Sequence, residues 1–200
     1  MPDKPKLLII AGPNGSGKTS ITSKILKHDW IEGCVYINPD NIARDVFGDW
    51  NSPEAVIKAV HYASKRREAC IQNKESLLFE TVLSAPDKLE FIAKAKKAGF
   101  FIRLFFVGTD HPAINASRIA HRVLEGGHDV PISKIVSRYA KSIANCAQAA
   151  QLVDRMYVYD NSIDDAFPKL LFRTTEGKIE KIYTRVNPWA EVILQVLQKS

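Results

Sequence analysis

A glycine-rich loop that directly follows a short apolar run constrains this chain more than any other feature. Residues 6–11 form a continuous run without polar alternation, which is typical of a parallel strand buried on both faces. A helix is predicted from residue 18 to about residue 28. The loop between them fits the pattern G-x-x-x-x-G-K-[ST] and reads Gly12-Pro13-Asn14-Gly15-Ser16-Gly17-Lys18-Thr19. This order indicates a phosphate-binding loop (P-loop), and the alternative is an ordinary glycine turn.

The residue types in this loop have defined roles toward a nucleotide. Glycines let consecutive backbone N–H groups turn inward around phosphates, and the following helix presents its positive end to them. Lys18 is expected to reach the β- and γ-phosphates, and the Thr19 hydroxyl is expected to hold magnesium. Ser20, the next residue, is included among the predicted nucleotide-binding residues. The expected cofactors are ATP and Mg²⁺.

The rest of the chain predicts an α/β fold of the P-loop NTPase class. Apolar strands are expected at 34–37, 76–79, 100–107 and 156–159, with helices between them. Together with residues 6–11 they predict a mostly parallel five-stranded sheet with helices on both faces. A β-hairpin at 169–174 and 178–184 and a helix from residue 188 follow. We expect one domain over 1–200, with a helical lid at about 111–151 and the C-terminal hairpin and helix at about 168–200.

Composition narrows the class further. The formal net charge of +6 suits an anionic ligand such as a nucleotide, a phosphorylated metabolite or nucleic acid. No apolar run approaches the roughly 20 residues that span a bilayer, and nothing resembles a secretion signal, so we expect a cytoplasmic protein without a membrane partner. The three cysteines, Cys34, Cys70 and Cys146, are widely spaced and are interpreted as reduced, small apolar residues.

Two acidic residues follow predicted strands and are candidates for metal binding or acid–base chemistry. Asp40 lies just beyond the strand at 34–37, and Glu80 directly ends the strand at 76–79. The carboxyl ends of parallel strands carry the ligand site in such sheets, so both side chains should face it. Asp40 is equally well explained as the N-cap of a helix, and Glu80 as the point where a strand meets water. Asp110 is a third candidate but is expected only to begin the next helix.

Three arginines fall in the segment where a lid is expected. Arg118 and Arg122 are four residues apart on one helix, and Arg138 lies on the next helix. Phosphoryl transfer spreads negative charge over the moving group, which arginines from a mobile segment can stabilise. The alternative is that they are solvated residues of a basic protein. His121 and His128 receive no catalytic role, and His128 is expected to shape the turn between the helices.

The sequence resembles the zeta toxin family, specifically its small, stand-alone bacterial members. The resemblance extends in order through about 150 residues and includes these segments: the P-loop, Asn38-Pro39-Asp40, Phe79-Glu80-Thr81, Arg122-Val123, Gly126-Gly127-His128-Asp129-Val130-Pro131, Arg138-Tyr139 and Tyr159-Asp160-Asn161-Ser162. The resemblance implies a nucleotide-kinase-like fold. It also implies phosphorylation of a hydroxyl of UDP-N-acetylglucosamine, and a separately encoded antitoxin as a partner.

The same resemblance implies roles for individual residues. Asp40 would be the base at the acceptor hydroxyl, and Glu80 and Thr81 would lie beside the acceptor and the magnesium ion. Arg122 and Arg138 would stabilise the transferred charge. Arg118 is grouped with the acceptor-binding residues. Asn161, with its neighbours Asp160 and Ser162, would border the adenine, although a polar turn explains that segment almost as well.

Two other functions compete with a small-molecule kinase. A polynucleotide 5′-hydroxyl kinase would suit the charge of +6, but the sequence lacks the interleaved basic and aromatic stretch of a strand-binding groove, so a nucleic-acid partner is not expected. An ATP-binding switch would need a residue that positions water and a partner signature, and neither is found. The sequence therefore favours a kinase for a small hydroxylated metabolite.

Overall fold

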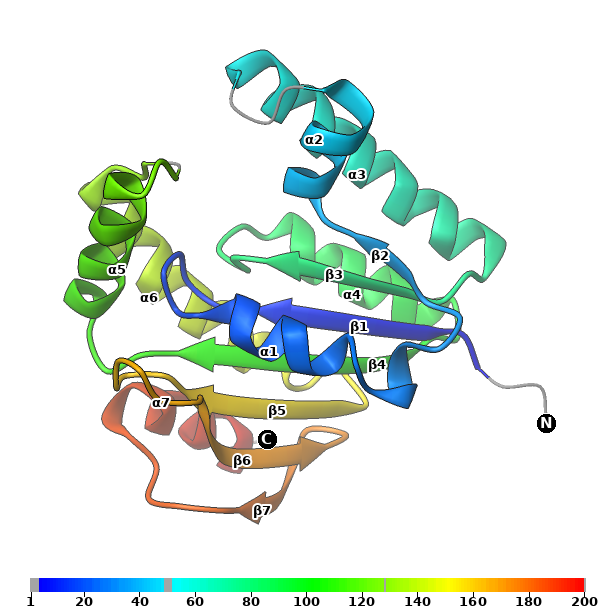
Figure 1. Ribbon diagram of the computed structural model, residues 1–200. Helices are drawn as coiled ribbons and strands as arrows, with labels where there is room; N and C mark the ends of the chain where they lie inside the picture. Colours follow the sequence, from blue (N-terminus) through cyan, green and yellow to red (C-terminus); the bar gives the residue numbers. More distant parts are fainter. Residues whose placement is uncertain (1–3, 49–51, 128, 200) are drawn as a thin grey trace.

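The computed structural model describes residues 4–48, 52–127 and 129–199, which build one mixed β-sheet with helices on both faces (Figure 1). Its parallel strands run in the spatial order β2-β3-β1-β4-β5. Their bounds are β1 (Lys6–Ala11), β2 (Val35–Ile37), β3 (Leu77–Thr81), β4 (Phe101–Gly108) and β5 (Arg155–Asp160). The predicted α/β fold with five parallel strands is thus confirmed.

The predicted C-terminal hairpin is also present, and it extends the same sheet. Strands β6 (Lys169–Thr175) and β7 (Lys178–Ile182) are antiparallel, and β6 pairs with β5. The sheet therefore has seven strands among the described residues. The turn between the two strands contains Glu176, with a φ of 49°, and Gly177, with a φ of 74°. Both lie in the left-handed region that tight hairpin turns use.

Helices cover the two faces unequally. Their bounds are α1 (Lys18–Ile25), η1 (Asp29–Ile31, a 3₁₀ turn), α2 (Pro39–Phe47), α3 (Pro53–Asn73), α4 (Asp87–Lys97), α5 (Pro112–Leu124), α6 (Ile132–Ala149) and α7 (Pro188–Gln198). Helix α1 packs on one face through Ile21 and Ile25. Helices α3, α4, α6 and α7 contribute to the larger apolar cluster on the opposite face. Because both faces are covered, strand β1 is apolar and fully buried from residue 7 to residue 11.

Element boundaries differ from the predicted ones by a few residues for local reasons. Helix α1 ends at Ile25 instead of residue 28, and His28 caps the 3₁₀ turn by accepting a hydrogen bond from the Trp30 N–H. Strand β3 runs two residues further than predicted, to Thr81, because Glu80 and Thr81 pair with the end of β1. This extension aligns Glu80 with the strand that leads into the P-loop.

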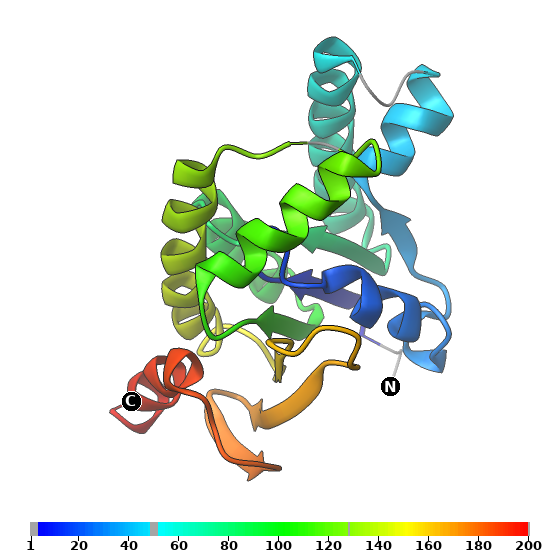
Figure 2. The ribbon, with the colours of Figure 1, turned by 60° about the vertical axis from the view of Figure 1, so that its left-hand side comes forward.

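Two helix pairs flank the P-loop (Figure 1), and the first helix of each pair, α2 or α5, follows the carboxyl end of a parallel strand. Helices α2 and α3 pack together above β2 and β3, and helices α5 and α6 pack together on the other side of the P-loop (Figures 1 and 2). The loop after β1 therefore opens between them. In open parallel sheets, the crevice beside a strand whose two neighbours are reached by connections in opposite directions is the usual ligand site.

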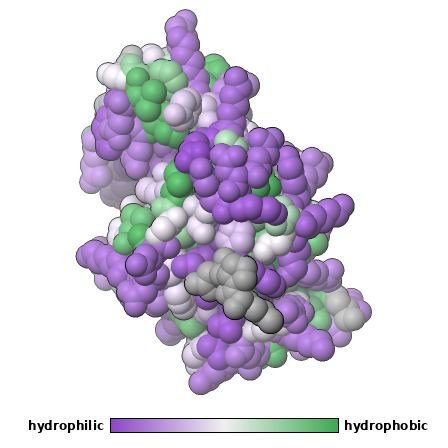
Figure 3. Space-filling model, turned by 90° about the vertical axis from the view of Figure 1, so that its right-hand side faces the viewer, coloured by the Kyte–Doolittle hydropathy of each residue, from purple (hydrophilic) through white to green (hydrophobic). Residues whose placement is uncertain are grey.

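Hydrophilic residues predominate on the face shown in Figure 3. Among the described residues, no helix has the length and apolar character needed to cross a membrane.

Candidate functional site at the carboxyl end of the sheet

The P-loop has a shape that its glycines require. Gly12 has a φ of 152°, and a Cβ atom there would lie 2.1 Å from the carbonyl oxygen of Val107. Gly17 has a φ of 85°, and its Cβ would lie 2.1 Å from Nδ2 of Asn161. A side chain at either position would collide with the neighbouring segment and strain the backbone. The loop can therefore turn its backbone toward a ligand only because these positions are glycine.

Lys18 turns back over the loop. Its Nζ donates to the carbonyl oxygens of Gly12 at 2.8 Å and Pro13 at 2.9 Å. Burial lowers the pKa of Lys18 to about 8, the negative charge of Glu80 opposes this shift, and the positive charge of Arg122 adds to it. An ammonium group has three donors, so one remains for a ligand oxygen. Charges from three separate segments thus act on one point beside the P-loop.

Two asparagines from distant segments fasten the loop. Asn115, in the first turns of α5, is fully buried and donates from Nδ2 to the carbonyl oxygen of Asn14 at 2.6 Å. Its Oδ1 accepts a hydrogen bond from the Thr109 hydroxyl. Asn161, after β5, donates from Nδ2 to the carbonyl oxygen of Ser16 at 2.9 Å. No sequence motif marks Asn115; its signal is a polar residue on the apolar side of a helix.

The residues at the loop fit a nucleoside triphosphate with a divalent cation. Within the described part of the chain, the buried Ser16 hydroxyl has no hydrogen-bond partner, as expected of a group that faces a ligand. Thr19 is exposed at the start of α1. No cluster of three or more histidine, cysteine or acidic residues that could hold a metal occurs in residues 4–48, 52–127 and 129–199.

The cap of helix α2 decides against one of the two interpretations of Asp40. Helix α2 is capped by Asn38, whose Oδ1 accepts from the Asp40 N–H at 2.8 Å, and Pro39 occupies the first helical position. The interpretation of Asp40 as the N-cap is therefore wrong. Asp40 lies in the first turn of α2 and is exposed. Its carboxylate is free of the capping function that Asn38 performs.

Glu80 lies at the end of β3, next to the P-loop strand. It is aligned with Ile10 of β1 and is partly buried. Its Oε1 accepts a hydrogen bond from the hydroxyl of Tyr36, in β2, at 2.7 Å. The following residue, Thr81, accepts a hydrogen bond from the Gly12 N–H through its carbonyl oxygen at 3.2 Å. Glu80 and Thr81 are therefore connected both to the loop and to the strand before Asp40.

The three arginines lie in different surroundings. Arg138, partly buried on α6, donates to Oδ1 of Asn14 at 3.4 Å, so it reaches the P-loop directly. Arg122 is exposed near the end of α5, and its charge acts on Lys18.

Arg118 faces the segment after β5 instead. It forms an ion pair with Asp164 at 2.6 Å and donates to the carbonyl oxygen of Asn161 at 2.8 Å. Its role in acceptor binding stays a prediction, and its contacts connect α5 with the segment predicted to border the adenine.

Polar residues at the end of β5 and after β4 and β5 are held by hydrogen bonds. Asp160 accepts from the Ser162 hydroxyl at 2.6 Å and from the Trp189 indole at 3.0 Å. Asp110 accepts from Asn187 at 2.7 Å, while His111 caps α5. The adenine-binding role of Asn161 stays a prediction. The proposed turn-shaping role of His128 lies outside the described residues.

Sequence comparisons relate this chain to a known protein family. Residues 1–167 match the family model described as Zeta toxin. An uncharacterized protein of Haemophilus influenzae is 27% identical over 140 residues, which cover 67% of this chain and 92% of that protein.

Two solved structures share the fold across nearly the whole chain. The complex of AvrRxo1-ORF1 and AvrRxo1-ORF2 with ATP contains a chain with a TM-score of 0.68 and 16% identity, covering 98% of this chain. This chain spans only 64% of the length of that protein. The structure of the PezAT chromosomal toxin–antitoxin system of Streptococcus pneumoniae gives a TM-score of 0.60 at 16% identity, covering 100% of this chain and 85% of the other. At such identities the likeness establishes the fold alone.

Proposed function

This chain belongs to the zeta toxin family, and we propose that it is an ATP-dependent kinase that transfers the γ-phosphate to a hydroxyl of a small metabolite, specifically a UDP-N-acetyl sugar. One arrangement carries the proposal: Arg138 of α6 donates to Oδ1 of Asn14 in the P-loop, the loop that also carries Lys18, at 3.4 Å. Glu80 lies at the end of β3, opposite Ile10 of the strand that leads into the same loop. A carboxylate, a lysine and an arginine around one point suit a site where phosphate charge moves. ATP as the donor is further supported by the ATP complex of the related AvrRxo1-ORF1 structure.

In the proposed reaction the acceptor oxygen attacks the γ-phosphorus, the bond from phosphorus to the β–γ bridging oxygen breaks, and ADP leaves. Asp40 accepts the proton of the acceptor hydroxyl, which its exposed position on α2 permits. Lys18, Arg122 and Arg138 offset the negative charge on the moving group. Thr19 and Glu80 would hold Mg²⁺, which when bound neutralises charge on the phosphate oxygens.

The helix pair α5–α6 is the proposed lid of a single kinase domain. Its base is anchored, because the Tyr139 hydroxyl donates to the Thr109 carbonyl oxygen and Asn115 holds the P-loop. Its far end is exposed: Leu124 is 84% and Ile132 is 71% solvent-accessible. An anchored base with an exposed end suits a segment that closes over bound substrates.

A separately encoded antitoxin is the proposed protein partner. Support comes from two structures of similar fold, one a complex of AvrRxo1-ORF1 with AvrRxo1-ORF2 and the other part of the PezAT toxin–antitoxin system.

A label-transfer experiment tests the proposed function. The protein is incubated with Mg²⁺, γ-labelled ATP and a panel of UDP-sugars, nucleosides and oligonucleotides, with Lys18→Ala as the matched control. Label is expected in a UDP-N-acetyl sugar with the wild type and not with the control. Label in an oligonucleotide would reassign the acceptor, and label only in free phosphate would contradict the kinase proposal.

A further inference from the structure

A tyrosine that no motif singles out touches the proposed site. Tyr36 is the polar residue of the short strand β2, and its ring packs beside the apolar cluster on the α1 side of the sheet. Its hydroxyl donates to Oε1 of Glu80 at 2.7 Å. A phenol hydroxyl has one proton to donate and an ionised carboxylate can only accept, so Tyr36 is the donor in this contact.

Asn38 extends this contact to the helix that carries Asp40. Its Nδ2 donates to the Tyr36 hydroxyl at 2.9 Å, and its Oδ1 accepts from the Asp40 N–H at 2.8 Å. One asparagine side chain therefore caps α2 and fixes the tyrosine at the same time. The result is a continuous chain of hydrogen bonds from the Glu80 carboxylate to the backbone of Asp40.

These hydrogen bonds join the end of β3, the short strand β2 and the first turn of α2. Strand β2 has three residues and pairs with β3 through Ile37 opposite Phe79, one residue before Glu80. A glutamate side chain has several freely rotating bonds, and holding it in one orientation costs conformational entropy. A hydrogen bond from a neutral hydroxyl to a carboxylate is charge-assisted and strong enough to favour one orientation. The Tyr36 hydroxyl is well placed to do this for Glu80.

We propose that Tyr36 is a positioning residue of the phosphotransfer site: it orients the Glu80 carboxylate toward the nucleotide-bound cation and, through Asn38, sets its position relative to Asp40. The inference rests on the proposed function for the identity of the cation site. Partners that orient a ligand group of a metal typically change metal affinity or activity by about 10- to 100-fold when removed.

The test is Tyr36→Phe, which keeps the ring and removes the hydroxyl. Mn²⁺ serves as the probe cation, and its affinity for the complex of the protein with a non-hydrolysable ATP analogue is measured by electron paramagnetic resonance. We expect Mn²⁺ binding to weaken by about 10- to 100-fold. In transfer assays the turnover number should fall while KM for ATP stays within about twofold, as expected when orientation in the transition state is lost.

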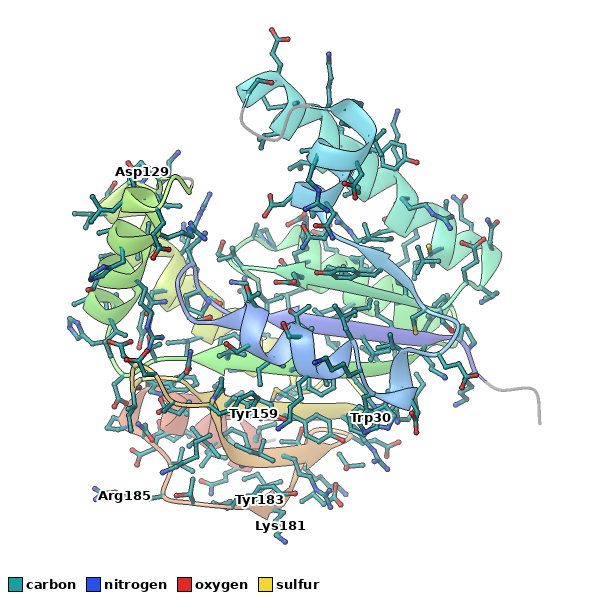
Figure 4. All side chains as sticks on the ribbon, in the orientation of Figure 1. Trp30, Asp129, Tyr159, Lys181, Tyr183 and Arg185 are labelled. Atoms are coloured by element: carbon teal, nitrogen blue, oxygen red, sulfur yellow. The ribbon has the colours of Figure 1, made fainter. Side chains whose placement is uncertain are left out.

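Two further variants separate positioning from a structural role. Tyr159→Phe removes the hydroxyl of another tyrosine packed beside the same apolar cluster (Figure 4) and should leave Mn²⁺ binding unchanged. Asn38→Ser keeps a capping oxygen but removes the amide that donates to Tyr36, and it should weaken Mn²⁺ binding less than Tyr36→Phe does.

Unchanged Mn²⁺ affinity in Tyr36→Phe, or an equal loss in Tyr159→Phe, would overturn the inference. A wild-type protein that binds Mn²⁺ and the ATP analogue but labels no acceptor would contradict the proposed function alone, since the Mn²⁺ measurement needs no acceptor.

Discussion

The phosphate-binding end of the site and the proposed acceptor end are built differently. At the phosphate end, Ser16 is fully buried and the loop is fastened by Asn115 and Asn161, so its shape is fixed by contacts with other segments. At the acceptor end, Asp40 and Arg122 are exposed on separate helices. The phosphate end is thus preorganised, whereas the side chains proposed for the acceptor end are exposed to solvent.

The difference has a chemical origin. Phosphate recognition uses backbone N–H groups of one short segment, which local glycine geometry can arrange before any ligand binds. Acceptor recognition needs side chains from helices that belong to two different pairs, and such side chains remain solvated until an acceptor replaces the water. Substitutions at the acceptor end should therefore reduce turnover with little effect on stability, whereas substitutions at the phosphate end should affect stability as well.

The largest effect is expected from the arginines of the proposed lid. Arg122→Ala and Arg138→Ala should each lower the turnover number by about 10³-fold, because arginine contacts strengthen as charge develops on the transferred group. ATP affinity should change less, and more in Arg138→Ala than in Arg122→Ala, since Arg138 contacts Asn14. The measurements are steady-state kinetics and calorimetric titration with ATP.

Arg173→Ala is the matched control for the arginine variants. Arg173 lies on the C-terminal hairpin and pairs with Glu180 at 2.6 Å, away from the P-loop elements. The turnover number of Arg173→Ala should equal that of the wild type. Normal turnover in both Arg122→Ala and Arg138→Ala would return these residues to the solvated-surface interpretation.

Asp40→Asn should produce an effect of the same order. The substitution removes the charge needed to accept a proton, so transfer to the acceptor should fall by roughly 10² to 10⁴. Because Asn38, and not Asp40, caps α2, the helix should be unaffected and the melting temperature should hardly change. Label transfer, ATP affinity and thermal melting are measured on the same preparations.

Asp45→Asn provides the comparison for Asp40. Asp45 is an exposed carboxylate on the same helix and pairs with Arg44 at 2.7 Å. Asp45→Asn should retain full phosphate transfer to the acceptor. Equal transfer by Asp40→Asn and the wild type would exclude Asp40 as the base and redirect the search to Glu80.

The predictable parts of the molecule are those with local signals. The P-loop and the five parallel strands follow from glycine spacing and apolar runs within a few positions. The placement of Glu80 near the P-loop follows from one rule about parallel sheets, and its pairing opposite Ile10 agrees with it.

The unpredicted parts depend on partners far apart in the chain. Asn115 meets Asn14 across 101 positions, and Tyr36 meets Glu80 across 44. Neither pair has a sequence spacing that identifies it, because only the folded arrangement of strands and helices brings the two residues together. The cap of α2 stayed open in the sequence for a different reason: Asn38 and Asp40 are both good capping residues, and only the backbone geometry distinguishes them.

Asn115→Ala should show the opposite pattern from the acceptor-end variants. It leaves the Asn14 carbonyl and the Thr109 hydroxyl without their partner, which should cost about 1 to 3 kcal/mol of stability. ATP affinity should also fall, by about tenfold, since the loop loses its anchor. Asn145→Ala is the control, because Asn145 makes a similar bond to the Leu83 carbonyl oxygen at 2.9 Å. It should lower stability but not ATP affinity; a loss of affinity in both would argue against a specific anchor.

The smallest expected effect is a pH dependence of the nucleotide-free protein. The ordinary pKa of lysine, 10.5, applies to the unfolded chain, whereas burial lowers the pKa of Lys18 to about 8 in the folded chain. Between these values the unfolded chain binds more protons, so the free energy of unfolding must rise with pH in this window. Below pH 8 Lys18 is charged in both states, and the cost of burying its charge is present in full.

The measurement is the difference in unfolding free energy between the wild type and Lys18→Met, determined by urea titration at pH 7.5, 8.5 and 9.5 without nucleotide. The difference should shift in favour of the wild type by roughly 1 to 2 kcal/mol across this range, because only the wild type relieves a buried charge as pH rises. Tyr139 and Tyr159, whose pKa values burial raises to about 12, act in the opposite direction above pH 10 and in both proteins alike. A difference that does not change with pH would mean that water already solvates the Lys18 ammonium, and the phosphate end would then be less preorganised than its contacts indicate.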